Sequence, residues 1–259
     1  MVRLPPHRGV PAIDYLSPVA IVYACVVMVA AYSARGASGF GAAAALPLLA
    51  LVMPVKVLVP AWTLLALVAG SALIGADRRR IAFAELLRLV PGTLAGVGVG
   101  LYVFTRLDSQ TLARWVGAFI LAYGLHALWS TFGRRHPSQL PPRLAAAIGG
   151  FAGGMTGTVV GTMGSTFFAI YFDAIRLAKD NYRATMTAIL LTLSVVRGAG
   201  YWAVGEFTRE ALITAAILFP PMLIGLYLGN RFHHGMGEIA FRRTVSGALI
   251  ASGLALVIK

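Results

Sequence analysis

The stretch ARGASGFGAAAALPLL, residues 34–49, decides how the rest of the chain is interpreted. An apolar run that begins at residue 17 would simply continue here if it formed one membrane helix. Instead an arginine, three glycines, a serine and then a proline interrupt it. Glycine lets the backbone leave helical geometry, and an arginine inside a membrane needs a polar partner. The stretch therefore predicts a broken helix with a function at the break.

The composition of the 259 residues places the chain in a membrane. Hydrophobic residues make up 58% and charged residues 12%, which leaves too little polar surface to cover a soluble globule of this size. The net charge of +13 does not indicate nucleic-acid binding, because the basic residues form short clusters between apolar segments. Cys25 is the only cysteine, so an intramolecular disulfide and a cysteine metal site are excluded. We expect no metal and no cofactor.

Apolar runs recur along the whole chain and predict an all-α polytopic membrane protein. Most are long enough to cross a bilayer, which takes about 20 helical residues. The runs 40–53 and 161–172 are too short, and each follows a longer run after a glycine-rich break, at Gly36–Gly41 and at Gly157–Gly164. We expect one broken or re-entrant pair of segments in each half of the chain. The ten runs are 17–34, 40–53, 57–76, 86–104, 115–133, 144–160, 161–172, 184–205, 211–230 and 244–258.

The second half of the chain repeats the first. An offset of 123 residues, which becomes 129 further along, pairs identical residues of the two halves. Glycines and a proline in register over long ungapped stretches favour an internal duplication. We expect residues 1–133 and 134–259 to form two repeats of about five segments each, together one domain. Matched pairs include Gly41 with Gly164, Ser71 with Ser194, Pro91 with Pro220 and Gly100 with Gly229.

Lysine and arginine are concentrated in every second loop, at 77–83, 134–143, 173–183 and 231–243. Loops of this kind face the cytoplasm. The loop that holds Arg78, Arg79 and Arg80 corresponds in the repeat to the loop that holds Glu206, so equivalent loops carry opposite bias. That pattern predicts inverted repeats. We expect a multi-pass protein of the cytoplasmic membrane, with both termini outside the cytoplasm and basic loops that attract anionic lipid.

Enzymatic chemistry is not indicated. The nine acidic residues lie in loops or at segment ends, so no pair of carboxylates falls at the bilayer centre. His233 and His234 are adjacent and lack metal-ligand spacing. The sequence GTMGS at 161–165 resembles a serine-nucleophile turn but lacks the glycine that follows the serine in such turns. We therefore expect no catalytic residues.

The two breaks are better suited to binding an anion. A helix that restarts after a break presents free N–H groups and the positive end of its dipole, and inversion brings two such ends together near the midplane. The alternative is that small residues only permit close helix packing, and we prefer it for the glycines of the fourth and ninth segments, such as Gly96 and Gly225. The residues expected to donate at the breaks are Ser38, Gly39, Gly41, Thr162, Gly164 and Ser165.

Arg35 and Arg197 carry charge where membrane helices rarely do. An arginine at the centre of such a helix costs at least about 2.5–3.5 kcal/mol on insertion scales. A bound anion would neutralise one or both, because a guanidinium presents paired donors that match the oxygens of sulfonate, sulfite or carboxylate. The alternative is an arginine that contacts backbone carbonyls or lipid phosphate. Ser71 and Ser194, which the repeat pairs, are expected to face the same cavity.

The broken stretches form a pair of motifs, GASGFGAAAALPLLALVMPVK at 36–56 and a weaker echo, GTVVGTMGSTFFAIYFDAIRLAK, at 157–179. They resemble the paired motifs of the TauE/SafE transporters, the sulfite exporter family. The resemblance implies a secondary carrier of sulfite, thiosulfate, small organosulfonates or other small organic anions. We predict a secondary transporter for a small, sulfur-containing anion that works by alternating access. The direction of transport and its coupling, to a proton or to sodium, stay open. An anion channel and a non-transporting accessory subunit are the alternatives, and the oligomeric state stays open.

Overall fold

The computed structural model describes residues 17–38, 45–130, 141–231 and 253–254, and the regular elements in these ranges are helices. Alanine and leucine, which are good helix formers, recur in most of them. In chain order they are α1 (Pro18–Ser38), α2 (Ala45–Ala50), α3 (Val55–Asp77), the 3₁₀-helix η3 (Arg78–Arg80), α4 (Phe83–Arg106), α5 (Ser109–Ser130), α6 (Pro142–Val159), α7 (Gly164–Ala174), α8 (Lys179–Val204) and α9 (Arg209–Arg231).

Five helices in the described part of the chain are long and apolar enough to cross a membrane, judged by length and composition. They are α1, α3, α4, α8 and α9. Large apolar side chains such as Val22, Leu94 and Trp202 are exposed on them, as expected for surfaces that face lipid. The prediction of an all-α polytopic membrane protein is confirmed.

Among the described residues, each half contains one short α-helix. α2 has six residues and α7 has eleven, so neither can cross a bilayer unaided. In the second half α6 ends at Val159 and α7 begins at Gly164. The break is therefore narrower than the predicted one at 157–164, because Gly157 and Thr158 remain in the last turn of α6.

In the first half the break begins later than expected. α1 continues as helix through Gly36 to Ser38, which corrects the expectation that the chain turns at Gly36. One glycine weakens a helix by only about 1 kcal/mol, and the long contact between α1 and α9 outweighs this cost. The expected restart near Phe40 and most of the tenth apolar run lie outside the described residues.

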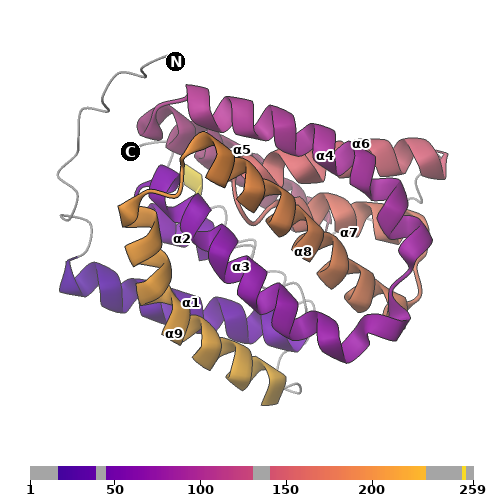
Figure 1. Ribbon diagram of the computed structural model, residues 1–259, viewed down its shortest axis with the longest axis horizontal. Coiled ribbons are helices and arrows are strands. Elements are labelled where there is room, and N and C mark those ends of the chain that lie inside the picture. The colour runs from indigo at the N-terminus through magenta and orange to yellow at the C-terminus, as the bar shows by residue number, and fades with distance from the viewer. Residues whose placement is uncertain (1–16, 39–44, 131–140, 232–252, 255–259) are drawn as a thin grey trace.

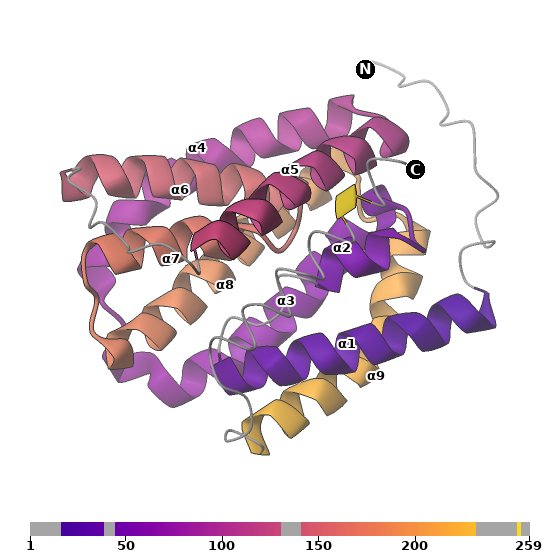
Figure 2. The same cartoon turned by 180° about the vertical axis from the view of Figure 1, so that it is seen from behind.

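The helices pack in pairs that follow the sequence repeat (Figure 1). α4 packs along α6, and the repeat counterpart of α4, which is α9, packs along α1. α3 contacts α8 near the centre, and α4 contacts α8 as α9 contacts α3. Helices that correspond in the two halves run in opposite directions, as α3 and α8 do in Figure 1 and α1 and α6 do in Figure 2. Inverted repeats give this arrangement.

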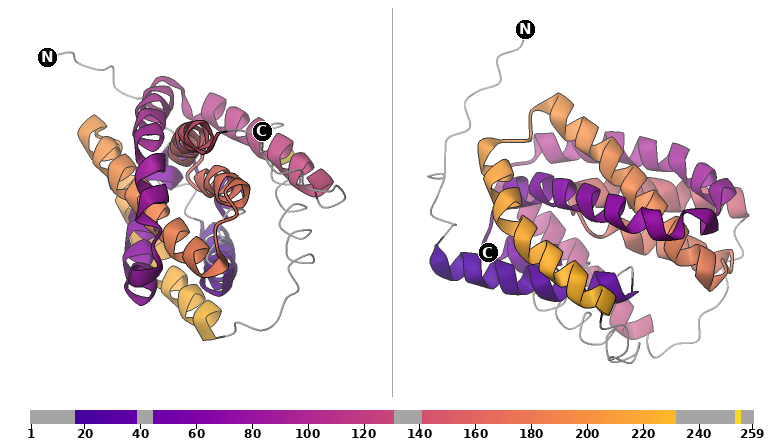
Figure 3. Two further views of the ribbon diagram at one scale, coloured as in Figure 1. Left: turned by 90° about the vertical axis from the view of Figure 1, so that its right-hand side faces the viewer. Right: turned by 60° about the horizontal axis from the view of Figure 1, so that its bottom comes forward.

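α1 and α9 lie side by side, as both views of Figure 3 show. The proposed boundary between the repeats, at residues 133 and 134, lies outside the described part of the chain. The division into 1–133 and 134–259 therefore stays a prediction.

Glycines set the close contact between α4 and α6. A Cβ added at Gly92 would lie 2.6 Å from a carbonyl oxygen of α6, and one at Gly96 would overlap the carbonyl oxygen of Phe151. In the counterpart pair, a Cβ at Gly225 of α9 would lie 2.6 Å from the carbonyl oxygen of Val29 in α1. The predicted packing role of these glycines is confirmed.

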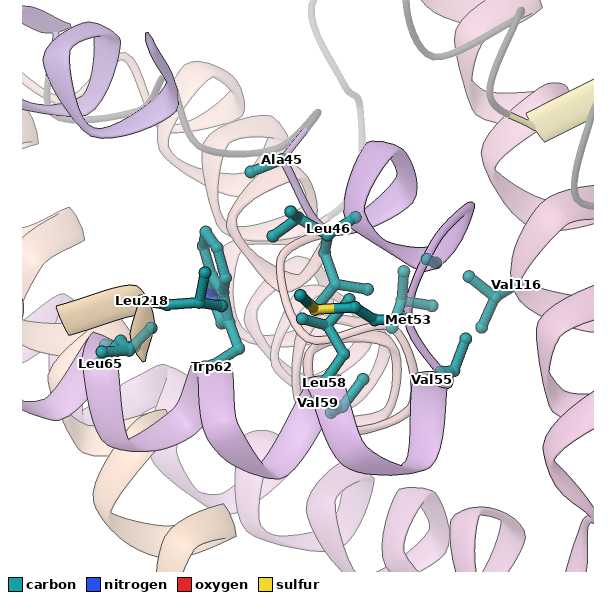
Figure 4. Close-up of a cluster of buried hydrophobic side chains, with 14 of the residues drawn as sticks. Ala45, Leu46, Met53, Val55, Leu58, Val59, Trp62, Leu65, Val116 and Leu218 are labelled. Carbon is teal, nitrogen blue, oxygen red and sulfur yellow. The ribbon is translucent and has the colours of Figure 1, made fainter. Parts of the chain in front are cut away.

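The short helix α2 is buried in the larger apolar core, between α1 and α3. Leu46 of α2 is fully buried, and its neighbours in this core come from both halves of the chain. Burying side chains of this size stabilises the fold by about 1.5–3 kcal/mol each. The residues labelled in Figure 4 are Ala45, Leu46, Met53, Val55, Leu58, Val59, Trp62, Leu65, Val116 and Leu218.

Candidate functional site

The candidate site is built around the second break, between α6 and α7. Gly161 lies in this break and has a left-handed backbone, with a φ of 84°, which residues with a Cβ disfavour. The space beside it is occupied by Leu46 of α2 and Val59 of α3, which a Cβ at Gly161 would meet. Both side chains point into the core cluster of Figure 4. The short helix of the first half therefore packs against the break of the second half.

Arg197, in the middle of α8, reaches across to this break. It is 2% exposed, and its Nη1 atom donates hydrogen bonds to the carbonyl oxygens of Gly157 and, at 2.7 Å, of Gly161. One helical turn further along α8, the Tyr201 hydroxyl donates to the carbonyl oxygen of Thr158. The end of a helix leaves its last carbonyls without helical partners. Arg197 and Tyr201 supply partners for them.

Arg35 approaches the same place from the last turn of α1. It is 8% exposed, and its Cζ atom lies 5.6 Å from the centre of the Tyr32 ring. Tyr32 is fully buried and interacts electrostatically with both arginines, and Arg35 acts on Arg197. Among the described groups that act electrostatically on Arg197, none is a carboxylate. The structure thus brings together the two predicted arginines as buried positive charges of like sign.

Two donors in this cluster have no acceptor. In the part of the chain that the structure describes, the buried Arg197 Nε and Tyr32 hydroxyl lack a hydrogen-bond partner. The Thr166 hydroxyl, in the first turn of α7, and the Thr214 hydroxyl of α9 are likewise buried and unpaired. Each such group costs about 1–3 kcal/mol. An anion beside Arg197 and Tyr32 would accept from both and offset the positive charge.

The start of α7 is buried beside the break, at Gly164, Ser165 and Thr166. The Ser165 hydroxyl donates to the carbonyl oxygen of Thr162 at 3.1 Å, and Thr162 is itself 9% exposed. Gly164 lies against α6, because a Cβ there would be 2.5 Å from the carbonyl oxygen of Gly153. Gly164 thus has a packing role whether or not its N–H group also meets a ligand.

The remaining predicted site residues are placed differently. Ser194 is buried, but its hydroxyl donates at 2.8 Å to the carbonyl oxygen of Leu190 in its own helix. Ser71 is exposed on α3, so the structure does not bring these two serines together in a buried site. Ser38 ends α1, and its side chain, together with Gly39 and Gly41, lies outside the described part of the chain.

Tyr32 and Tyr201 belong to the cluster although the sequence pattern did not single them out. Tyr32 precedes Arg35 by three residues and Tyr201 follows Arg197 by four. Residues three or four apart lie on one face of a helix. A polar aromatic residue at this spacing from an intramembrane arginine is therefore the signal that would have identified them.

Contacts between aromatic side chains lie on both sides of Arg197 along α8. Toward the C-terminal end of α8, the rings of Tyr201 and Phe104 have centres 5.1 Å apart. Toward its N-terminal end, Tyr182 meets Phe172 of α7 at 5.5 Å. Along α8, Arg197 thus lies between these two ring contacts.

A second polar cluster joins α7 to the start of α4. The Tyr171 hydroxyl donates to Glu85 Oε2 at 2.5 Å, and Arg88 Nη1 forms an ion pair with Glu85 Oε1 at 2.5 Å. Tyr171 is buried, whereas the Arg88 side chain is 46% exposed. Because this carboxylate already has two partners, the cluster holds two helices together and offers no free charge to a solute.

A helical membrane protein with buried, like-charged arginines at a helix break has the features of a membrane transporter for anions. The family model described as Sulfite exporter TauE/SafE matches residues 23–256. The chain therefore belongs to the TauE/SafE sulfite exporter family, which is a family of membrane transporters of the anion exporter type. Searches of curated proteins and of solved structures gave no match.

Proposed function

We propose that the protein is a secondary transporter that moves a small sulfur-containing anion, such as sulfite, thiosulfate or an organosulfonate, across the cytoplasmic membrane. The observation that supports this most directly is the pairing of Arg35 with Arg197 beside the second break. Both are buried, and no carboxylate acts on Arg197 among the described groups. An oxyanion would supply the missing negative charge and accept from Arg197 Nε and the Tyr32 hydroxyl.

Alternating access is the transport mechanism that we propose. Aromatic contacts on both sides of Arg197 supply a barrier toward each end of α8. Inverted repeats let one half rock against the other, so that one barrier opens while the other stays closed. Gly161, the glycine with positive φ in the break, gives the backbone a point at which α6 and α7 can change their angle.

The proposed orientation follows from charge. The three exposed arginines of η3 would lie in the cytoplasm beside anionic lipid, and both termini would lie outside. Labelling tests this orientation. In a Cys25→Ala background, Arg79→Cys should react with a membrane-impermeant maleimide only after the cells are made permeable. Labelling of intact cells would place this loop outside and reverse the proposed topology.

Counterflow in proteoliposomes tests the function. Vesicles loaded with unlabelled sulfite, thiosulfate or taurine should accumulate the same solute from a trace of its radiolabelled form, because a carrier exchanges solute across the membrane. Arg197→Ala and Arg35→Ala should lower the initial rate. A charge-assisted hydrogen bond contributes about 1.5–3 kcal/mol, which corresponds to roughly a 10- to 150-fold effect.

Arg209→Ala is the matched control, because it removes an exposed arginine at the start of α9, away from the break. Its rate should equal that of the wild type. A large anion conductance without counterflow would identify a channel instead. Full activity of both Arg197→Ala and Arg35→Ala would rule out the proposed site.

A further inference from the structure

The carbonyl groups at the second break form a site that suits a cation. Gly157 and Thr158 lie in the last turn of α6, where the helix dipole has its negative end. The left-handed turn at Gly161 brings one more carbonyl to the same place, since Gly157 and Gly161 accept from a single nitrogen. Unwound carbonyls and the C-terminal ends of interrupted helices are the groups that hold coupling cations in secondary transporters.

In this protein the positive charge at these carbonyl oxygens is the guanidinium of Arg197. Arg197 Nη1 donates hydrogen bonds to the carbonyl oxygens of Gly157 and Gly161, and the Tyr201 hydroxyl donates to the carbonyl oxygen of Thr158. The guanidinium is buried, so it is not a surface group that water could replace without cost. A sodium ion at the same oxygens would have to displace a positive charge that is covalently attached to α8.

Local charge opposes a second cation in the same way. Arg35 already repels Arg197, because both carry positive charge, and no carboxylate acts on Arg197 among the described groups. A further positive ion at this depth would raise the repulsion, whereas an anion lowers it. In the first half, the repeat places Ile74 where the second half has Arg197, so the first half has no arginine at the corresponding position.

We propose that the Arg197 guanidinium occupies the place of a coupling cation at the second break, so that the anion moves without sodium. This inference rests on the proposed transport function, and it narrows the coupling, which the sequence left between a proton and sodium. Arg197 then has two roles in one side chain. Its Nη1 atom holds the break together, and its unpaired Nε atom is left for the anion.

The first test uses the wild-type protein in proteoliposomes that exchange sulfite or thiosulfate, with the membrane potential clamped and the pH fixed. External sodium chloride is replaced by potassium chloride or by choline chloride. We expect the initial rate and the apparent affinity to stay the same. A coupling ion typically changes affinity by about 5- to 150-fold, so a drop of that size in sodium-free medium would overturn the inference.

The second test removes the built-in cation. Arg197→Ala, checked for folding by gel filtration and thermal unfolding, should lose uptake and should regain part of it when guanidinium or sodium ions are added. Arg209→Ala should show neither loss nor response. Full uptake by a folded Arg197→Ala variant without an added cation would contradict the inference, as would a failure of both ions to restore it.

The two tests also separate this inference from the function on which it rests. Absence of exchange by the wild type under every cation would refute the proposed transport of these anions, and the inference with it. Exchange that requires sodium would leave transport intact and overturn only the role given to Arg197. If Arg197→Ala does not fold, the cation replacement in the wild type decides the question alone.

Discussion

Compared along the repeat, the two halves place their buried cations on different elements. Arg35 lies in the last turn of α1 and corresponds to Thr158, while Arg197 lies in the middle of α8 and corresponds to Ile74. The helix pairs around them do correspond, since α4 with α6 repeats as α9 with α1. The two halves thus share their scaffold of paired helices. The charge of the site comes from two arginines that have no arginine counterpart in the other half. Changes in the scaffold should therefore affect folding, and changes in the site should affect transport.

The largest effect is expected at the interface between α4 and α6. Gly96→Ala should destabilise the protein by about 3 kcal/mol or more, because the new Cβ would overlap backbone atoms of α6, and these can move only if the whole helix moves. Gly98→Ala, two residues away with no atom within 4 Å of its Cβ, should be neutral or stabilise by about 0.5–1 kcal/mol. Thermal unfolding in detergent measures both. Equal midpoints for the two variants would show that the halves do not depend on this contact.

The second break should be the next most sensitive place. Gly161→Ala forces a Cβ into a left-handed conformation, which costs about 1–2 kcal/mol, and pushes it against Leu46. Gly205→Ala carries the same backbone cost, with a φ of 77°, but its Cβ meets nothing within 4 Å. Both variants should lose stability, and only Gly161→Ala should also slow anion exchange. A Gly205→Ala variant as slow as Gly161→Ala would argue that exchange reports general stability.

The sequence predicted the scaffold better than the site, for a physical reason. Apolar runs and the alternation of basic loops depend on the bilayer and the translocation machinery, which act on each segment by itself. They predicted the all-helical fold and the short segment of the second half. Contacts across the break depend on how far one helix is rotated about another, and this is not encoded in any single segment. The partners of Arg197, which are carbonyls of Gly157 and Gly161, could not be predicted in this way.

The sequence repeat correctly indicated residues that pack in the same way in both halves, and it was misleading for residues that do not. It paired the packing glycines of α4 with those of α9 correctly. It also paired Ser71 with Ser194, but one is exposed and the other is buried and bonded within α8. Arg35 and Arg197 were identified by their cost in a membrane and not by the repeat. Intramembrane charge was therefore the better guide to the candidate site.

Substitutions at two tyrosines distinguish a role in the scaffold from a role in the site, with smaller expected effects than the glycine substitutions. Tyr201→Phe leaves the Thr158 carbonyl without its donor and should destabilise the protein by about 1 kcal/mol. Tyr32→Phe removes a hydroxyl that has no acceptor among the described residues, so the midpoint of thermal unfolding should fall less than in Tyr201→Phe. Its expected effect is a weaker apparent affinity for the anion in counterflow. An unchanged affinity would exclude the Tyr32 hydroxyl from the proposed site.

The smallest effect concerns how two helices of the scaffold begin. Asp108 caps α5, where its Oδ2 atom accepts from the N–H groups of Gln110 and Thr111 at 3.0 Å, and Thr208 caps α9 with a neutral hydroxyl. Hydrogen bonds, the side chain of Thr111 first, hold the pKa of Asp108 below its ordinary value. A lowered folded-state pKa adds stability above the ordinary pKa, and this is lost as the pH falls through the lowered value.

Asp108→Asn keeps a capping oxygen and removes the charge. The wild type should therefore be slightly more stable than Asp108→Asn at about pH 6, and this difference should shrink when the pH is lowered to about 3, below the ordinary pKa of an aspartate. Thr208→Ser, which keeps a neutral cap on α9, should show the same offset from the wild type at both values. Asp108 is exposed, so anion exchange near neutral pH should not change in either variant. A change in exchange would connect the start of α5 to transport and weaken the separation of scaffold from site.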